Sequence, residues 1–319
     1  MTHDLRRLAI TLTAAALAAA LAAPATAAAE TPDVTHPRPL SYAITADPAN
    51  GLEGIHVTQE GTAYVTSVFT GAVFRGDTRT GVFRTWLPAG SDGRDHATGI
   101  HVDRWGTVLV TGAFDGTFFR YAADGTLLAK RTLAGEHFLN DFAMTRDAVF
   151  ATDSFTSTVY RADLSATALG DFVPFAGPDA FGAKAEFLNG IVATSDGRWL
   201  LVVDWSTNTT WRVDARTGEV REVAVAGGSL GGDGLLLRGR TLESVQTDWA
   251  TEETFVRTAQ FTGDFSAAVV VRDSARVSAV EVGPTTIARD RGRLLWVEGQ
   301  LSDETPDVPY RVSVVPPAE

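Results

Sequence analysis

Residues 53–86 read EGIHVTQEGTAYVTSVFTGAVFRGDTRTGVFRTW, and this stretch decides the fold. It holds short runs of β-branched and aromatic residues, separated by turns that contain Gly, Asp and Thr. Runs of this length and composition, closed by such turns, predict β-strands joined by tight hairpins. Four strands are expected here, at Ile55 to Thr58, Thr62 to Thr66, Ala72 to Arg75 and Val82 to Trp86.

The four-strand pattern returns along the chain, and an apolar residue followed by arginine marks each return. Successive arginines of these pairs are 45, 41, 51, 45 and 54 residues apart. A period of this length indicates a repeat architecture, so we predict an all-β, six-bladed β-propeller of four-stranded blades. We expect the apolar member of each pair to pack between blades, because neighbouring side chains on a strand face opposite ways. The pairs are Phe74-Arg75, Phe119-Arg120, Tyr160-Arg161, Trp211-Arg212, Val256-Arg257 and Tyr310-Arg311.

The last two repeats depart from the pattern. In the fifth, Asp248 to Glu253 predicts an inserted loop. The sixth ends after its third strand, at Tyr310 to Val314, while Leu40 to Ile44 stands before the first repeat. We expect this early segment to supply the missing fourth strand, which closes the ring and removes an exposed sheet edge.

A polar residue stands just before the first strand of every repeat, most often followed by Gly and an aliphatic residue. First strands line the centre of a propeller, so we expect these anchor residues to form a ring around its axis. All of them carry a side-chain oxygen, and none is Cys or His. The anchors are Glu53, Thr98, Asn140, Asn189, Asp233 and Thr285.

This ring of oxygen atoms suits a hard cation. Ca²⁺ takes about six to eight oxygen ligands, and the carboxylates of Glu53 and Asp233 would balance its charge. Without a cation, two facing carboxylates repel each other and their pKa values shift. Zn²⁺ is disfavoured, because nitrogen and sulfur ligands are missing. We predict one Ca²⁺ in the central channel, with Asp141 as a further ligand or supporting group; the competing interpretation is that Asn, Asp and Gly only start strands as turn formers.

These motifs resemble those of the senescence-marker-protein, gluconolactonase and regucalcin family of six-bladed propellers, over roughly residues 50–300. In place of the family's Glu-Gly-Pro, Asn-Asp-Gly, Ser-Asn-Gly and Pro-Asp-Gly, the chain has Glu53-Gly54-Ile55, Asn140-Asp141-Phe142, Leu188-Asn189-Gly190 and Gly232-Asp233-Gly234. The resemblance implies direct metal ligation by Glu53, Asn189 and Asp233. It also places Asn140 close to the metal or the substrate, and it makes Asp233 the catalytic acid or base. The expected ligand set is therefore Glu53, Asn140, Asn189 and Asp233.

The chain also departs from that family. The Pro of the opening motif and a Trp downstream of it are missing. The family's sugar-lactone enzymes place an arginine two residues before the Asn-Asp pair, where this chain has Phe138. Metal binding is thus better supported than sugar-lactone hydrolysis, and Phe138 with Phe142 favours a more hydrophobic substrate. We expect substrate contacts from Thr98, Phe138, Asp141 and Thr285.

Histidines near the anchors are further candidates for acid–base chemistry. His96 stands two residues before Thr98 and His137 three before Asn140, so each is a candidate general base at the channel mouth. An ordinary loop or strand role is the competing interpretation. His56 and His101 occupy the same place in their first strands, which favours a packing role.

The N-terminus predicts export. Arg6 and Arg7 precede a Leu/Ala run from Leu8 to Ala23, and A-x-A cleavage sites follow within residues 25–29. This pattern is typical of a secretory signal peptide. We expect residues 1–29 to be removed and residues 30–319 to form a single propeller domain in a secreted protein. The chain has no Cys, so its stability must come from core burial or a metal.

Charge limits the partners. The net charge is -12, and cleavage would leave 25 basic and 38 acidic residues. Such a surface repels phosphate backbones, so nucleic acid is not expected to bind. After residue 30, no apolar run approaches the ~18 residues that span a bilayer. We expect a monomer that binds a small molecule.

Two functions fit these expectations. The first is a secreted, Ca²⁺-dependent hydrolase of a lactone or related ester, in which the metal polarises the carbonyl and activates water while Asp233 moves the proton. The second is a non-enzymatic propeller whose metal joins the blades and whose face binds a ligand or a protein.

Overall fold

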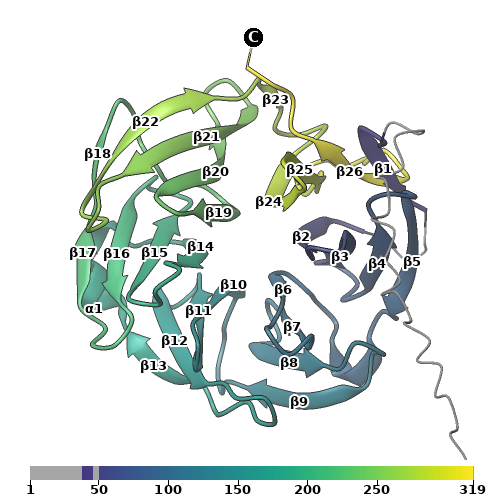
Figure 1. Ribbon diagram of the computed structural model, residues 1–319, viewed down its shortest axis with the longest axis horizontal. Helices are drawn as coiled ribbons and strands as arrows, with labels where there is room; N and C mark the ends of the chain where they lie inside the picture. Colours follow the sequence, from purple (N-terminus) through teal and green to yellow (C-terminus); the bar gives the residue numbers. More distant parts are fainter. Residues whose placement is uncertain (1–37, 46–49, 319) are drawn as a thin grey trace, which may run out of the picture. The chain divides into compact units, whose positions relative to one another are not determined.

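The computed structural model describes residues 38–45 and 50–318. These residues form six sheets arranged in a ring around a common centre, which confirms the six-bladed β-propeller (Figure 1). The first strand of each repeat is the innermost strand of its sheet. The innermost strands are β2 (Leu52–Val57), β6 (Ile100–Val102), β10 (Leu139–Met144), β14 (Leu188–Ala193), β19 (Leu235–Arg238) and β24 (Pro284–Asp290).

The remaining strands continue each sheet outward in chain order, as the turn spacing predicts. Helical structure in the described residues is limited to α1 (Pro178–Phe181), η1 (Ser91–Gly93) and η2 (Gly182–Lys184). The outer strands of the first four sheets are β3 (Thr62–Ser67), β4 (Val73–Asp77), β5 (Val82–Leu87), β7 (Val108–Thr111), β8 (Thr117–Tyr121), β9 (Leu127–Thr132), β11 (Ala148–Asp153), β12 (Thr158–Asp163), β13 (Val173–Ala176), β15 (Trp199–Asp204), β16 (Thr210–Asp214) and β17 (Val220–Glu222).

The ring closes as expected. The strand β1 (Ser41–Ile44) pairs with β26 (Tyr310–Val314), and the sixth sheet has the order β1-β26-β25-β24, with β25 at Arg293–Glu298. The Tyr42 hydroxyl donates to the Thr78 carbonyl oxygen at 2.9 Å, which ties this strand to the first blade. The two ends of the described chain therefore meet in one blade, in which β1 is the outermost strand.

The fifth blade differs from its prediction, because the expected inserted loop is wrong. Strands β20 (Thr241–Asp248) and β21 (Glu253–Phe261) pair along their whole length, so residues 248 and 253 face each other across the ladder. The repeat pattern is less regular here because the two strands of this hairpin are long, and not because a loop is inserted. The sheet also contains β22 (Ala267–Asp273), β18 (Ala224–Ala226) parallel to it, and β23 (Val277–Ser278) beside β21.

The apolar-arginine pairs lie on the third strand of every blade, and the apolar partner is buried each time. The core consists of six clusters in the described residues, and each cluster joins neighbouring blades. The arginines belong to none of these clusters: Arg75 and Arg311 are exposed, whereas Arg120 is buried and pairs with Asp103 at 3.0 Å. The expected packing role of the pairs is thus confirmed.

The expected signal peptide at residues 1–29 lies outside the described residues. Within the part of the chain that the structure describes, no helix is both long enough and apolar enough to cross a bilayer.

Candidate functional site

The anchor residues leave their strand ladders at β-bulges. In the first blade, Leu52 pairs with Ser67 and Ile55 with Val65, so Glu53 and Gly54 together face only Thr66. The same register shift occurs at Asn140, Asn189 and Thr285. A bulge bends its strand and redirects the side chain at the extra position. The local sequence thus turns four anchors out of the regular pleat at the inner end of the blades.

Glycine after an anchor allows neighbouring inner strands to approach closely. A Cβ atom at Gly54 would lie 2.3 Å from the Thr98 carbonyl oxygen, and one at Gly190 would lie 2.2 Å from that of Asp233. Real Cβ atoms do not come this close to backbone, so only Gly fits. The anchor-Gly pattern therefore has a packing cause as well as a turn-forming one.

A cavity of about 290 Å³ opens at the end of the inner strands where the bulges lie. The polar residues at its floor come from four different blades and include all four expected metal ligands. Thr285 and Phe138 line it as well. The structure thus brings together Glu53, Asn140, Asn189 and Asp233, which are up to 180 residues apart in the sequence.

Two carboxyl groups that line this cavity, those of Glu53 and Asp233, have raised pKa values. Burial, and then repulsion from Asp233 and Asp141, raises the pKa of Glu53 well above its ordinary value. Burial and repulsion from Asp141 raise the pKa of Asp233 to about 7, against an opposing hydrogen bond from the Asn189 side chain. Carboxylates held together without a compensating cation behave in this way. A cation between them would favour the charged form of both carboxyl groups and so oppose both shifts.

Asn140 adds an acceptor that has no partner. Its Nδ2 donates to Ser154 Oγ at 3.1 Å, which fixes the orientation of the amide. Its Oδ1 is buried and accepts no hydrogen bond from the protein. Buried polar atoms are almost always paired, so this oxygen in the cavity wall is available to a ligand. Amide and carboxylate oxygens are ligands that Ca²⁺ prefers, and the residues present fit that ion.

In the described residues, no three side chains of the His, Cys, Asp or Glu type gather as a metal-binding group. The cavity set consists instead of two carboxylates and two amides. With both carboxyl groups ionised, this set carries a charge of -2, equal and opposite to that of a divalent cation.

The other residues that the sequence predicted near the site make contacts within the protein. Thr98 is fully buried outside the cavity, where its hydroxyl donates to the Leu139 carbonyl oxygen at 2.8 Å. The Thr285 hydroxyl donates to the Glu53 carbonyl oxygen at 2.7 Å, so it joins two blades although the residue lines the cavity. Asp141 stands at the position that Gly takes in other blades, and its Oδ1 lies 3.7 Å from His101 Nε2. Phe142 is fully buried against His101.

None of the described histidines lines the cavity. His137 Nδ1 lies 2.6 Å from Asp153 Oδ2, and its ring is buried. His96 Nδ1 lies 3.1 Å from Asp115 Oδ1 at the blade surface. His56 faces His101 at 3.3 Å between their Nδ1 atoms, and burial followed by repulsion from His101 lowers the pKa of His56 to about 3. The carboxylates are thus the acid–base groups closest to any ligand in the cavity.

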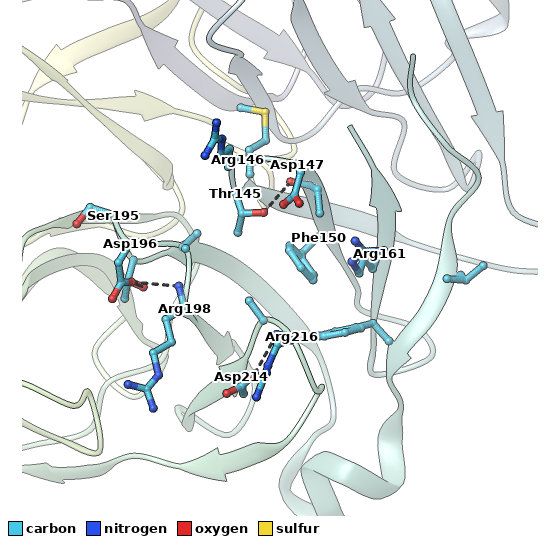
Figure 2. A pocket seen from close by; sticks show the side chains of 18 residues that line it. Thr145, Arg146, Asp147, Phe150, Arg161, Ser195, Asp196, Arg198, Asp214 and Arg216 are labelled. Carbon is cyan, nitrogen blue, oxygen red and sulfur yellow. Dashed lines mark hydrogen bonds between the residues drawn. The ribbon is translucent and has the colours of Figure 1, made fainter. Parts of the chain in front are cut away.

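A larger cleft, of about 1130 Å³, lies at the opposite ends of β10 and β14 (Figure 2). Its walls include Arg146, Arg198 and Arg216. Its acids serve turns: Asp196 and Asp214 accept the backbone N–H groups of Arg198 and Arg216. A hydrogen bond from the Thr194 hydroxyl lowers the pKa of Asp196, the reverse of the shift at Glu53. Raised carboxyl pKa values favour the smaller cavity as the functional site.

The cavity has an aromatic wall, which we define as Phe138, Phe187, Trp205 and Trp249; of these, the sequence predicted only Phe138 as a site residue. These residues line the cavity above its polar floor. Trp205 and Trp249 stand in the hairpins between the second and third strands of their blades. The signal was in the sequence, because every repeat has a large apolar residue in that hairpin. These residues are Phe69, Phe114, Phe155, Trp205, Trp249 and Leu301.

Comparison with known proteins supports the fold. No protein-family model matches the chain. No curated protein matches it in sequence either. Solved structures do match. The allergen Mala s 1 of Malassezia sympodialis aligns with a TM-score of 0.64 at 12% identity, over 87% of this chain and 96% of that one.

Two enzyme- or metal-related structures also align. A streptogramin B lyase aligns with a TM-score of 0.57 at 12% identity, over 86% of this chain and 96% of that one. Regucalcin from Agrobacterium tumefaciens, described as a calcium-binding protein, aligns with a TM-score of 0.55 at 17% identity, over 85% and 93%. Regucalcin is one of the proteins after which the family that the sequence motifs resemble is named. At these identities the likeness establishes the propeller fold and leaves the activity open.

Proposed function

We propose that this protein is a Ca²⁺-dependent hydrolase of a lactone or related ester, acting in the cavity that Glu53, Asn140, Asn189 and Asp233 line. One observation carries the proposal: the buried Oδ1 of Asn140 has no partner and borders the same cavity as two carboxylates with raised pKa values. A divalent cation satisfies all three groups at once.

The four residues would hold the cation in complementary ways. Glu53 and Asp233 supply the negative charge, while Asn140 and Asn189 supply neutral oxygen. The hydrogen bond from Asn140 to Ser154 keeps the amide oxygen turned into the cavity. Water and substrate would complete the ligand set, because Ca²⁺ takes more ligands than these residues offer.

In hydrolysis, the cation and Asp233 would have different roles. When bound, Ca²⁺ polarises the ester carbonyl as a Lewis acid. We assign to Asp233 the removal of a proton from the attacking water and its return to the leaving alkoxide. The position of Asp233 supports this role, because its carboxylate lines the cavity in which the water and the ester would lie.

The competing function is a non-enzymatic propeller in which the metal only joins the blades. The position of the histidines favours it, since none of those described lines the cavity as a base. Under this alternative, calcium binds and stabilises the protein but no ester is hydrolysed.

A panel of lactones and aryl esters tests the two functions with three proteins: wild type, Asp233→Asn and Glu60→Gln. Glu60 is an exposed carboxylate in the turn after β2, so it controls for a simple loss of charge. We expect calcium-dependent hydrolysis by wild type and Glu60→Gln, and a loss of more than about 100-fold in Asp233→Asn. Unchanged hydrolysis in Asp233→Asn would contradict the assigned role. Calcium binding without any hydrolysis would favour the binding module.

We also propose that the protein is exported and works as a monomer on a small molecule. The Arg6-Arg7 pair, the apolar run after it and the A-x-A sites support export. N-terminal sequencing of the mature protein should begin near Glu30. A mature protein that retains residues 1–29 would contradict this, as would a dimer in light scattering.

A further inference from the structure

The cavity has two chemically different halves. Its floor is polar and charged, whereas its aromatic wall and the neighbouring Val68 and Leu301 are apolar. The aromatic wall is continuous: ring centroids are 5.9 Å apart from Phe138 to Phe187, 6.0 Å from Phe187 to Trp205, and 5.6 Å from Trp205 to Trp249. A ligand at the floor therefore has these rings on one side, and a part that extends away from the floor can lie against them.

Packing of the hydrophobic core does not account for the whole aromatic wall. Trp249 is 49% exposed, in the hairpin between β20 and β21, and it belongs to none of the core clusters of the described chain. Its hairpin-tip equivalents Phe69, Phe114 and Phe155 are 51%, 48% and 53% exposed. Contiguous exposed apolar surface of this kind marks binding sites in soluble proteins.

The wall also limits what can bind. The hydroxyl groups of a sugar lactone need hydrogen-bond partners that phenyl side chains such as Phe138 and Phe187 do not offer, and a hydroxyl buried without a hydrogen bond costs about 1–3 kcal/mol. An alkyl chain or aryl ring in the same place gains from the loss of water-exposed apolar surface. The volume of about 290 Å³ lies near the lower end for small-molecule pockets, so the occupant is small.

We propose that the site takes esters or lactones that carry an alkyl chain or aryl ring, and that this apolar part lies on the wall of Phe187, Trp205 and Trp249. The inference rests on the proposed function for the position of the reacting carbonyl, at the polar floor beside Asp233. It adds the substrate class, which the floor residues alone do not determine.

Kinetics with a graded series of lactones tests this class. The substrates are γ-butyrolactone, γ-hexalactone and γ-octalactone, which share one ring, together with D-glucono-δ-lactone. We expect kcat/KM to rise along the series by up to about fourfold per added methylene, as burial of each methylene predicts. The sugar lactone should be the poorest substrate.

Trp249→Ala and Phe69→Ala form a matched pair of variants. Both residues are half-exposed aromatics in the same hairpin of their blades, but only Trp249 lines the cavity. Trp249→Ala should lower kcat/KM for γ-octalactone at least tenfold and leave γ-butyrolactone within twofold, while Phe69→Ala should leave both near wild type. Equal effects of the two variants, or a series flat in chain length, would overturn the inference while hydrolysis itself stands.

Binding of the γ-lactam analogue of γ-octalactone separates this inference from the proposed function. The lactam resists hydrolysis, and Trp205 and Trp249 report its binding through fluorescence. If no lactone is hydrolysed but the lactam binds and Trp249→Ala weakens it at least tenfold, the ligand class holds and the enzyme function fails. If no lactone is hydrolysed and the lactam leaves the fluorescence unchanged at millimolar concentration, both the enzyme function and the ligand class fail.

Discussion

The Thr285 hydroxyl donates a hydrogen bond to the Glu53 carbonyl oxygen at 2.7 Å, across 232 residues of sequence. The bond links the inner strand of the last blade to that of the first, at the point where the ring closes. Because Glu53 is a candidate ligand, the closure of the propeller and the position of this carboxylate are coupled. The candidate site is thus a consequence of ring assembly rather than of any one blade.

This coupling gives a first prediction. Thr285→Val removes the donor and leaves a buried carbonyl oxygen without its partner, which should lower the free energy of unfolding by about 1–3 kcal/mol. It should also weaken calcium binding through displacement of Glu53. Thr286→Val is the control, because that hydroxyl makes no hydrogen bond in the described chain. Urea unfolding and a calcium titration of both variants check the prediction; equal behaviour would contradict it.

A second prediction concerns close packing between inner strands. Gly190→Ala places a methyl group 2.2 Å from the Asp233 carbonyl oxygen, so the fourth and fifth blades must separate. We expect a loss of about 1–3 kcal/mol in the free energy of unfolding, together with weaker calcium binding.

The matched substitution is Gly177→Ala. A Cβ atom there would meet nothing within 4 Å, so its stability should stay within about 0.5 kcal/mol of wild type. Differential scanning fluorimetry compares the two. A Gly190→Ala protein as stable as Gly177→Ala would show that the blades do not constrain each other here.

A third prediction concerns pH in the absence of calcium. Glu53 and Asp233 keep their protons in the folded state at pH values where the unfolded chain has lost them, because their pKa values are raised. The folded state then binds more protons, so the free energy of unfolding falls as the pH rises from about 4 through 7. Glu53→Gln removes one charge of the pair, and it should exceed wild type in stability at pH 8 by about 1 kcal/mol or more.

Near pH 4, Glu53→Gln and wild type should be equally stable. His56 acts in the opposite direction: its pKa of about 3 in the folded state means that stability falls as the pH drops below 6.5. His56 is present in both proteins, so its contribution cancels in the difference between their free energies of unfolding. Glu60→Gln should track wild type throughout, and a stability difference that does not change with pH would refute the electrostatic account.

A fourth prediction uses the unpaired amide oxygen. Asn140→Asp adds a third carboxylate, which should destabilise the calcium-free protein at pH 8 but tighten calcium binding by on the order of tenfold. Asn140→Leu removes the ligand oxygen, so it should weaken binding; it also removes the hydrogen bond to Ser154 and should lower the calcium-free stability by about 1–3 kcal/mol. Isothermal titration calorimetry and thermal unfolding with chelator measure the two effects. An Asn140→Leu protein that binds calcium as tightly as wild type would argue against Asn140 as a ligand.

Much of the fold could be predicted from the sequence. The period of the apolar-arginine pairs located the third strand of every blade, and the incomplete sixth repeat indicated closure by Leu40 to Ile44. Strand alternation and turn residues carry this information locally. The fifth blade was harder, because Asp248 and Glu253 read as polar loop residues although they end paired strands. Pairing with a partner strand overrode the local signal.

The candidate site was predictable in part. The side chains at one cavity include four anchors, and each anchor lies at the start of an inner strand or just before it. These anchors are Glu53, Asn140, Asn189 and Asp233. Thr98 shares that sequence position, but its side chain turns to the Leu139 carbonyl oxygen. Asp141 lies beside His101 because its blade lacks the Gly that follows other anchors. Side-chain direction at a bulge depends on the neighbouring blade, which one repeat does not encode.

Calorimetric titration of the chelator-treated protein with CaCl₂ tests the central claim, a cation held by Glu53, Asn140, Asn189 and Asp233, most directly. We predict one calcium per chain for wild type, and at least a 100-fold loss of affinity in Glu53→Gln but not in Glu60→Gln. A wild-type protein that binds no calcium at millimolar concentration would contradict the claim. So would a Glu53→Gln protein that binds calcium as tightly as wild type.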